Sequence, residues 1–165
     1  LPVLPDTYAS LGVKVTGSIH HDPSLATFLK GWFQMGLDGN YHWIPLPSRV
    51  VRCCKVLTPN PDIENYLNEQ TAGLVQYSRG PVLQAFIEAF PPLGDSKTDP
   101  WKVQGATVHK IDQHAVAQNI CIRYQITVDE LYRFIHALRK AKPYTVMVSR
   151  VALAFVAKDY ADLTF

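Results

Sequence analysis

The segment from Thr127 to Leu138 constrains the fold more than any other part of this sequence. Its first four residues, Thr-Val-Asp-Glu, match a capping box, in which the Thr127 hydroxyl accepts from the third helical amide and Glu130 bonds back to the cap. Apolar residues then recur at helical spacing, at Leu131, Phe134, Ile135 and Leu138. The pattern predicts a helix that buries one face and ends at Lys142-Pro143.

Weaker periodicities predict the remaining elements. An amphipathic helix is expected after an Asp22 cap with Pro23 in its first turn, with apolar residues at Leu25, Phe28, Leu29, Trp32 and Phe33. A shorter helix is expected at Ile63–Asn68, and residues 82–90 fit either a helix or an irregular segment. Apolar runs predict strands at residues 11–19, 49–57, 73–77, 101–111, 120–126 and 144–156. The expected fold is α+β, an antiparallel β-sheet packed against two main amphipathic helices.

The length of 165 residues indicates a single domain. Residues 1–10 contain two prolines and no periodicity, so they are expected to form an extended arm, followed by one core domain at residues 11–165. With 47% hydrophobic and 18% charged residues and a net charge of +2, the composition excludes disordered, collagen-like and coiled-coil chains. No run reaches the roughly 18 apolar residues of a membrane helix, and the first residues do not resemble a secretory signal.

Few residues are spaced for catalysis or for metal binding. The three cysteines cannot all pair within one chain, which favours a reducing compartment. Nucleophile elbows, Walker loops and dinucleotide-binding glycine motifs are absent from the sequence, so no enzyme activity, cofactor or metal is expected. A metal- or thiol-dependent enzyme remains an alternative, and its candidate residues are His20, His21 and Asp22 with Cys53 or Cys54.

Basic residues gather at the end of the best predicted helix, at Arg133, Arg139, Lys140 and Lys142. Cations there complement the helix C-terminus, and they also suit a small patch for a polyanion or an anionic membrane. The tyrosines and phenylalanines fall at core spacings, which does not favour an exposed platform for stacking RNA bases. One functional hypothesis is therefore a small nucleic-acid- or protein-binding module that uses the basic group from Arg133 to Lys142.

Four short stretches carry a family resemblance. They are Gly12-Val13-Lys14-Val15, Leu29-Lys30 with a Gly39-Asn40 exit, the run from Gln76 to Pro81, and Ile120-Cys121-Ile122-Arg123. In order and spacing they resemble the core domain of rhabdovirus matrix proteins, particularly the lyssavirus branch. The turn Arg79-Gly80-Pro81 belongs to this resemblance.

The resemblance implies a non-enzymatic viral structural protein that self-associates and links the nucleocapsid to the inner face of the envelope during assembly and budding. Its partners would be further copies of itself, the viral nucleocapsid, an anionic membrane surface and host factors. Its locations would be the virion, the host cytoplasm, the inner membrane face and the host nucleus. Arg133, Arg139, Lys140 and Lys142 would then contact nucleocapsid or membrane. Two family features, a lysine-rich segment and a P-P-x-Y motif, are not found in these residues.

The arm supplies a test of self-association. Leu4, Pro5 and Tyr8 are expected to contact a neighbouring molecule head to tail, because a heterologous contact that does not close produces filaments or lattices. Packing of the arm on its own domain is the alternative. Deleting residues 1–8 should abolish concentration-dependent assembly in sedimentation velocity while the fold is retained. Unchanged sedimentation of the shortened chain would contradict the prediction.

Overall fold

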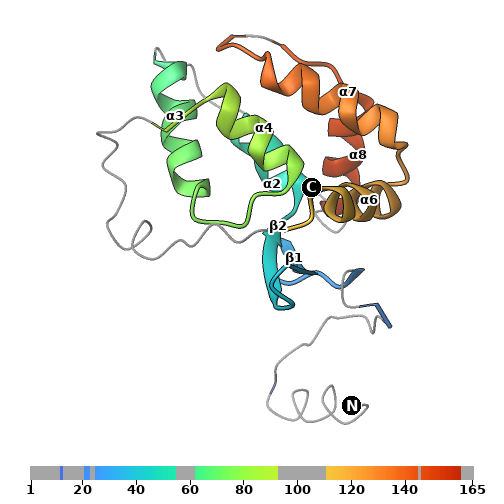
Figure 1. Ribbon diagram of the computed structural model, residues 1–165. Helices are drawn as coiled ribbons and strands as arrows, with labels where there is room; N and C mark the ends of the chain where they lie inside the picture. The colour runs from blue at the N-terminus through green and yellow to red at the C-terminus, as the bar shows by residue number, and fades with distance from the viewer. Residues whose placement is uncertain are drawn as a thin grey trace.

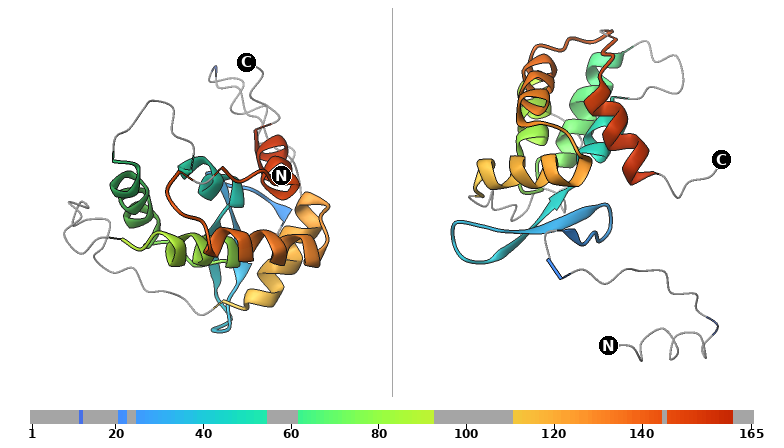
Figure 2. Two further views of the ribbon diagram at one scale, coloured as in Figure 1. Left: turned by 90° about the horizontal axis from the view of Figure 1, so that it is seen from above. Right: turned by 90° about the vertical axis from the view of Figure 1, so that its right-hand side faces the viewer.

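Helices dominate the part of the chain that the structure describes. This structure is a computed structural model, and it describes residues 12, 21–22, 25–54, 62–92, 111–144 and 146–160. Within these ranges there are six helices and one two-stranded antiparallel sheet. The helices lie together, and the sheet projects from one side of them (Figures 1 and 2). The α+β class is confirmed, but the described sheet is far smaller than expected. No helix in these ranges is long and apolar enough to span a bilayer.

The sheet is a hairpin of β1 (Gly31–Met35) and β2 (Tyr41–Pro45). Its turn places Gly39 at a φ of 77°, and the Asp38 carboxylate accepts from the backbone amide of Asn40 at 3.1 Å and bonds the His42 ring at 2.8 Å. The helix predicted to include Leu25 through Phe33 is therefore wrong. Leu29 and Lys30 have positive φ values of 51° and 60°, which no α-helix accommodates.

The helices begin where the sequence offers a cap or a proline. Asp62, Asp112, Thr127 and Ser149 each accept from a backbone amide in the first turn of their helix, whereas Pro47 and Pro81 occupy the first helical position of two others. The helices are α2 (Pro47–Cys53), α3 (Ile63–Leu74), α4 (Pro81–Ala89), α6 (Gln113–Tyr124), α7 (Val128–Arg139) and α8 (Arg150–Asp159).

Four of the predicted strands are wrong. Residues 49–53 lie in α2, residues 73–74 end α3, residues 120–124 lie in α6, and residues 150–156 lie in α8. In α6, Ile120 and Tyr124 are buried four residues apart, whereas Ile122 is 69% exposed, so the alternation there has no structural role. Residues 101–110 lie outside the described residues, and so does the strand predicted at 11–19 except for Gly12, which lies in a turn. Ile111 alone forms a bridge, to Gly36.

The prediction for α7 is confirmed. The Thr127 amide donates to Glu130 Oε2 at 2.8 Å, and the Glu130 amide donates to Thr127 Oγ1 at 3.2 Å, which completes the capping box. The four apolar positions at residues 131, 134, 135 and 138 are all buried. The short helix expected at Ile63–Asn68 is also present and extends to Leu74, and residues 82–90 are mostly helical.

An aromatic cluster joins the last three helices. Phe155 of α8 has no exposed surface, and its ring centroid lies 4.7 Å from that of Tyr124 in α6 and 5.6 Å from that of Phe134 in α7. The Tyr124 hydroxyl also donates to the Asp159 carboxylate at 2.8 Å. Burial, then the Asp159 charge, raise the pKa of Tyr124, so its hydroxyl remains a donor. This cluster fixes the end of α8.

Trp32 attaches the hairpin to the helices. It is 1% exposed and lies on the inner face of β1, opposite Ile44 of β2, which is equally buried. The Arg123 guanidinium of α6 lies 5.4 Å from a Trp32 ring centroid, within range of a cation–π contact. The neighbouring residue Phe33 faces outward and is 39% exposed. One face of the hairpin therefore belongs to the core, and the other faces solvent.

Removing the α7 cap should destabilise the chain measurably. Thr127→Ala is expected to lower the free energy of unfolding by about 1 kcal/mol, because it leaves the Glu130 amide without its acceptor. Thr127→Ser retains the hydroxyl and should remain close to the parent chain. Urea denaturation followed by circular dichroism measures both, and equal stability of Thr127→Ala and the parent would contradict the role of the cap.

Candidate basic and aromatic surface

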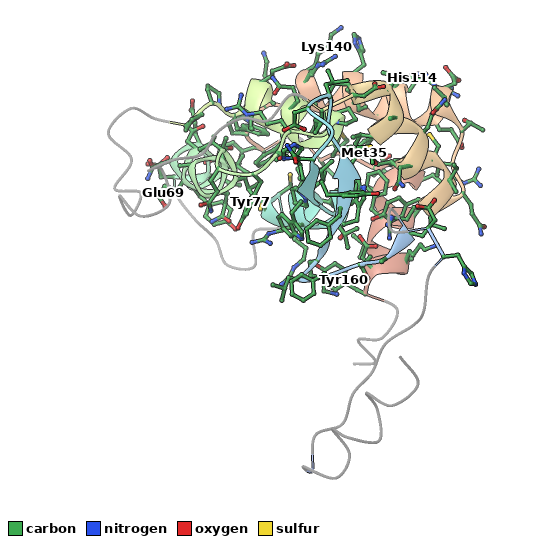
Figure 3. All side chains as sticks on the ribbon, turned by 60° about the horizontal axis from the view of Figure 1, so that its bottom comes forward. Met35, Glu69, Tyr77, His114, Lys140 and Tyr160 are labelled. Atoms are coloured by element: carbon green, nitrogen blue, oxygen red, sulfur yellow. The ribbon has the colours of Figure 1, made fainter. Side chains whose placement is uncertain are left out.

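Three cations and three aromatic rings lie together where the hairpin meets α2 and the end of α8. We call this group the basic–aromatic surface, and its members are Lys30, Arg49, Arg52, Trp43, Tyr77 and Tyr160. The three rings are half-buried, while Lys30 and Arg52 are exposed. Figure 3, which brings the hairpin side forward, shows Tyr77 and Tyr160 in the same view as the hairpin residue Met35.

In one half of this surface, Arg49 contacts the rings of Tyr77 and Trp43. Its guanidinium carbon lies 4.9 Å from the Tyr77 ring centroid and 5.8 Å from the Trp43 centroid, and those two rings are 5.0 Å apart. Arg49 Nη2 also donates to the Tyr77 hydroxyl at 3.2 Å. A guanidinium over two ring faces is held by the rings' electron density, and no carboxylate takes part.

Tyr160 organises the other half. Lys30 Nζ lies 4.6 Å from its ring centroid, and the Arg52 guanidinium carbon lies 5.1 Å from it. Arg52 Nη1 donates to the Tyr160 hydroxyl at 3.2 Å, and Lys30 Nζ donates to the backbone carbonyl of Asp159 at 2.9 Å. Because Asp159 is anchored by Tyr124, the buried aromatic cluster determines where Tyr160 lies.

Local structure brings the two halves together. Arg49 and Arg52 are three residues apart in α2, so their side chains share one face of that helix. In the strand predicted at 49–57 they would have pointed to opposite faces. The Leu46 amide donates to the Lys30 carbonyl at 2.9 Å, which ties the start of β1 to the start of α2.

Gly31 makes room for the Trp43 indole. A Cβ atom on Gly31 would lie 2.1 Å from Trp43 Cε2, so any side chain there would displace the ring. The indole N–H donates to the Phe28 carbonyl at 2.9 Å, which fixes the orientation of the ring across the hairpin. Glycine is therefore required by close approach and not by its backbone angle.

The charge of this surface is only partly offset. Burial raises the pKa of the nearby Asp159 carboxylate, and the Lys30 ammonium acts against this effect by lowering that pKa. Among the described residues, no carboxylate lies within ion-pair distance of Lys30, Arg49 or Arg52. The basic group predicted from the sequence differs from this surface, because two of its four cations form ion pairs with acidic side chains. Arg133 pairs with Asp129 at 2.5 Å and Arg139 with Glu88 at 2.6 Å. The structure places all four predicted cations on or just after α7, with Lys140 and Lys142 exposed, but acids offset half of their charge.

The other predicted residues have structural roles or lie outside the described residues. Gly80 and Pro81 begin α4, and the Arg79 carbonyl accepts from Gln113 at 2.6 Å, so this turn is joined to α6. The proposed contact residues Leu4, Pro5 and Tyr8, together with His20, are outside the described ranges.

The thiols are not arranged for catalysis. Cys53 Sγ donates to the Arg49 carbonyl at 3.3 Å, and Cys54 Sγ to the Val50 carbonyl at 3.8 Å. Burial raises the pKa of both thiols, which leaves them protonated and weakly nucleophilic at neutral pH. His21 and Asp22 are exposed, and within the described ranges no three histidine, cysteine or acidic side chains are grouped so as to hold a metal ion.

Sequence reasoning missed the basic–aromatic surface because it assigned the tyrosines and phenylalanines to the core. Tyr77 does pack against the core, but Tyr77 and Tyr160 are only half-buried and their rings also meet cations, as does the ring of Trp43. The alternation from Tyr41 to Pro45 was the available signal, since it places Trp43 on the face opposite buried Ile44. Comparisons with protein-family models, with curated proteins and with solved structures find no match to this chain.

Gly31→Ala tests the geometry of the surface. The added methyl group should displace the Trp43 indole, break its bond to Phe28 and cost about 1–3 kcal/mol of stability. The measurement is the indole N–H resonance of Trp43 in a ¹⁵N-correlated NMR spectrum, together with urea denaturation. Gly73→Ala is the matched control, because nothing lies within 4 Å of its added Cβ and alanine favours a helix. An unmoved indole resonance in Gly31→Ala would refute the arrangement.

Proposed function

We propose that this chain is a non-enzymatic binding module that holds single-stranded nucleic acid on the basic–aromatic surface. The observation that carries the proposal is that Lys30, Arg49 and Arg52 are positioned by aromatic rings and a backbone carbonyl, with no carboxylate in ion-pair distance among the described residues. The positive charges of Arg49 and Arg52 are therefore available to an external anion, whereas Lys30 shares its charge with the nearby Asp159 carboxylate. A phosphate backbone is the polyanion that such spaced cations suit.

The rings favour a single strand over a duplex. Bases of a single strand are unpaired, and each can stack on an aromatic side chain or on a guanidinium plane. Trp43, Tyr77 and Tyr160 are half-buried, so their rings keep a fixed position while part of each surface meets solvent. The guanidinium groups of Arg49 and Arg52 lie over rings, and a base can also stack on a guanidinium plane. This combination of fixed rings and of cations without an ion-pair partner among the described residues supports sequence-tolerant recognition.

The matrix-type role remains a prediction beside this proposal. It shares the need for a polyanion, either nucleocapsid or anionic lipid, but its self-association residues lie outside the described ranges. Two of the four basic residues it relies on, Arg133 and Arg139, are engaged by acids. The basic–aromatic surface suits either polyanion electrostatically, whereas its rings suit bases. The test therefore compares RNA with lipid.

Binding of a short oligouridylate, measured by fluorescence anisotropy, tests the proposal. Affinity should fall steeply between about 50 and 200 mM salt, because bound phosphates release counterions. The double variant Arg49→Gln, Arg52→Gln should bind about tenfold more weakly and should reduce the salt slope by about 0.7 per charge removed. The matched control is Arg133→Gln, Arg139→Gln, which removes the same charge from cations already paired with acids and should change the affinity little.

Three results would contradict the proposal. Equal losses in the two double variants would indicate a dependence on net charge alone. Duplex RNA bound as tightly as the single strand would remove the role of the rings. Binding to phosphatidylserine vesicles without binding to the oligouridylate would favour the matrix-type role.

A further inference from the structure

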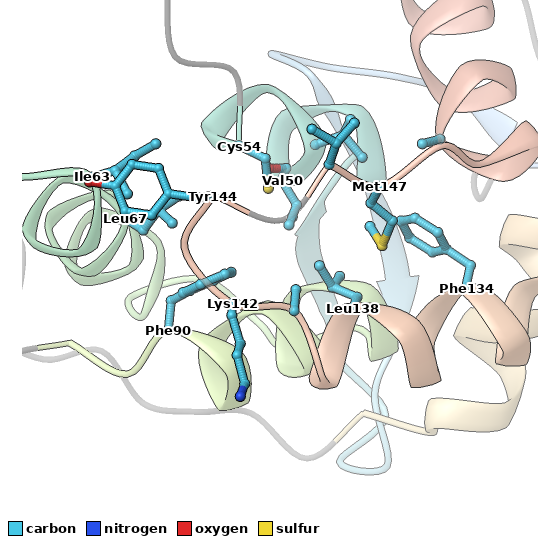
Figure 4. A pocket seen from close by; sticks show the side chains of 14 residues that line it. Val50, Cys54, Ile63, Leu67, Phe90, Phe134, Leu138, Lys142, Tyr144 and Met147 are labelled. Atoms are coloured by element: carbon cyan, nitrogen blue, oxygen red, sulfur yellow. The ribbon is translucent and has the colours of Figure 1, made fainter. Parts of the chain in front are cut away.

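A pocket opens on another side of α2. It has a volume of about 380 Å³ and lies between α2, α3, the end of α4, α7 and α8. Figure 4 shows the side chains that line it, with Leu138 and Phe134 from α7, Val50 from α2 and Leu67 from α3. Its volume falls in the range of about 300–1,000 Å³ that small-molecule sites occupy. It shares no residue with the basic–aromatic surface.

The lining is apolar and carries one charge. Among the residues that the structure describes, fourteen border the pocket, and Lys142 is the only one of these that is charged at neutral pH. Although Cys54 as a residue is exposed, burial of its thiol raises the pKa, so the sulfur is neutral. No aspartate or glutamate is among these described lining residues. In Figure 4 the Lys142 side chain starts at the edge of the pocket and extends away from the apolar lining, with its nitrogen at the far end. Long cationic side chains commonly cover apolar surface in this way.

The segment between α7 and α8 forms the mouth of the pocket. Tyr144 has a φ of 68°, a conformation that costs a non-glycine residue free energy, and it lies beside Ile63 and Leu67 in Figure 4. Val146, which also lines the pocket, is 88% exposed. Apolar side chains therefore continue from the interior to the surface, and an elongated apolar ligand could follow that path from the rim.

We propose that this pocket binds a single-chain amphiphile with a carboxylate end, such as a free fatty acid. The apolar tail lies among Leu67, Phe134, Leu138 and Met147, and the carboxylate meets the Lys142 ammonium at the rim. The chemistry of the lining selects this class. The described part of the lining, apolar with one cation and no acid, complements a ligand that is apolar except for one anionic group.

Titration calorimetry with dodecanoate, kept below the concentration at which it forms micelles, tests the proposal. Saturable one-to-one binding is expected, with octanoate and decanoate binding progressively more weakly. Each methylene removed should cost about fourfold in affinity while the tail still fits the pocket. Dodecanol, which has the same tail and no charge, should bind more weakly than dodecanoate.

Two neighbouring lysines provide the matched variants. Lys142→Gln should weaken dodecanoate binding by about fivefold or more, and Lys142→Arg should retain it, since the contact is between opposite charges. Lys140→Gln removes the same charge from an exposed lysine that does not line the pocket and should leave the affinity unchanged. Equal effects of Lys142→Gln and Lys140→Gln would refute the assignment of the carboxylate to Lys142.

Substitutions that fill the pocket test whether the apolar tail of the fatty acid lies inside it. Ala152→Phe adds a ring to the α8 wall and should abolish dodecanoate binding. Circular dichroism checks its fold, and if it does not fold, Val51→Met adds less volume for the same purpose. Undiminished binding in a folded filling variant, or no saturable binding to the parent chain, would overturn the proposal. A dimer in sedimentation without dodecanoate binding would also overturn it and would assign the pocket to a second copy of the chain.

Discussion

The packing of Phe155 against Tyr124 and Phe134 is the contact on which the rest of the described structure depends. These three rings come from the last three helices, and each helix uses one of them to reach the others. The hydroxyl of Tyr124 then fixes Asp159, and Tyr160 follows it directly in the chain. A residue on the surface is therefore positioned by a residue that has no contact with solvent, because Phe155 is completely buried.

In the hairpin, two tryptophans likewise link the buried core to the surface. Trp32 faces the helices and is almost fully buried, while Trp43 lies on the opposite face of the sheet and meets Arg49. Since side chains alternate along a strand, the burial of Trp32 and Ile44 determines that Phe33 and Trp43 face outward. The pairing register of β1 and β2 thus decides both which side chains enter the core and which lie on the candidate surface. A slip by one residue would exchange the two sets of side chains.

The sequence predicts this structure correctly where a local signal, such as a helix cap, fits only one kind of secondary structure. The Thr127 capping box was recognised in the sequence and its helix forms as expected, and the helix expected at Ile63–Asn68 is present but extends to Leu74. The prediction failed where apolar spacing fitted two structures. Ile120 to Ile126 alternates like a strand, yet the Asp112 cap and the left-handed Gln125 delimit a helix. The candidate surface could not be predicted, because its cations come from segments that only tertiary packing brings together, such as Lys30 and Tyr160.

Leu29 and Lys30 introduce a conflict between stability and charge. Both residues have left-handed backbone angles without being glycine, and each such residue costs about 1–2 kcal/mol. Directed evolution for thermal tolerance alone would favour glycine at position 30, which relieves the strain and deletes one of the three surface cations. The most heat-resistant descendants of this chain would then carry a weaker basic–aromatic surface. The strain at Lys30 is the thermodynamic cost of holding a cation beside Tyr160.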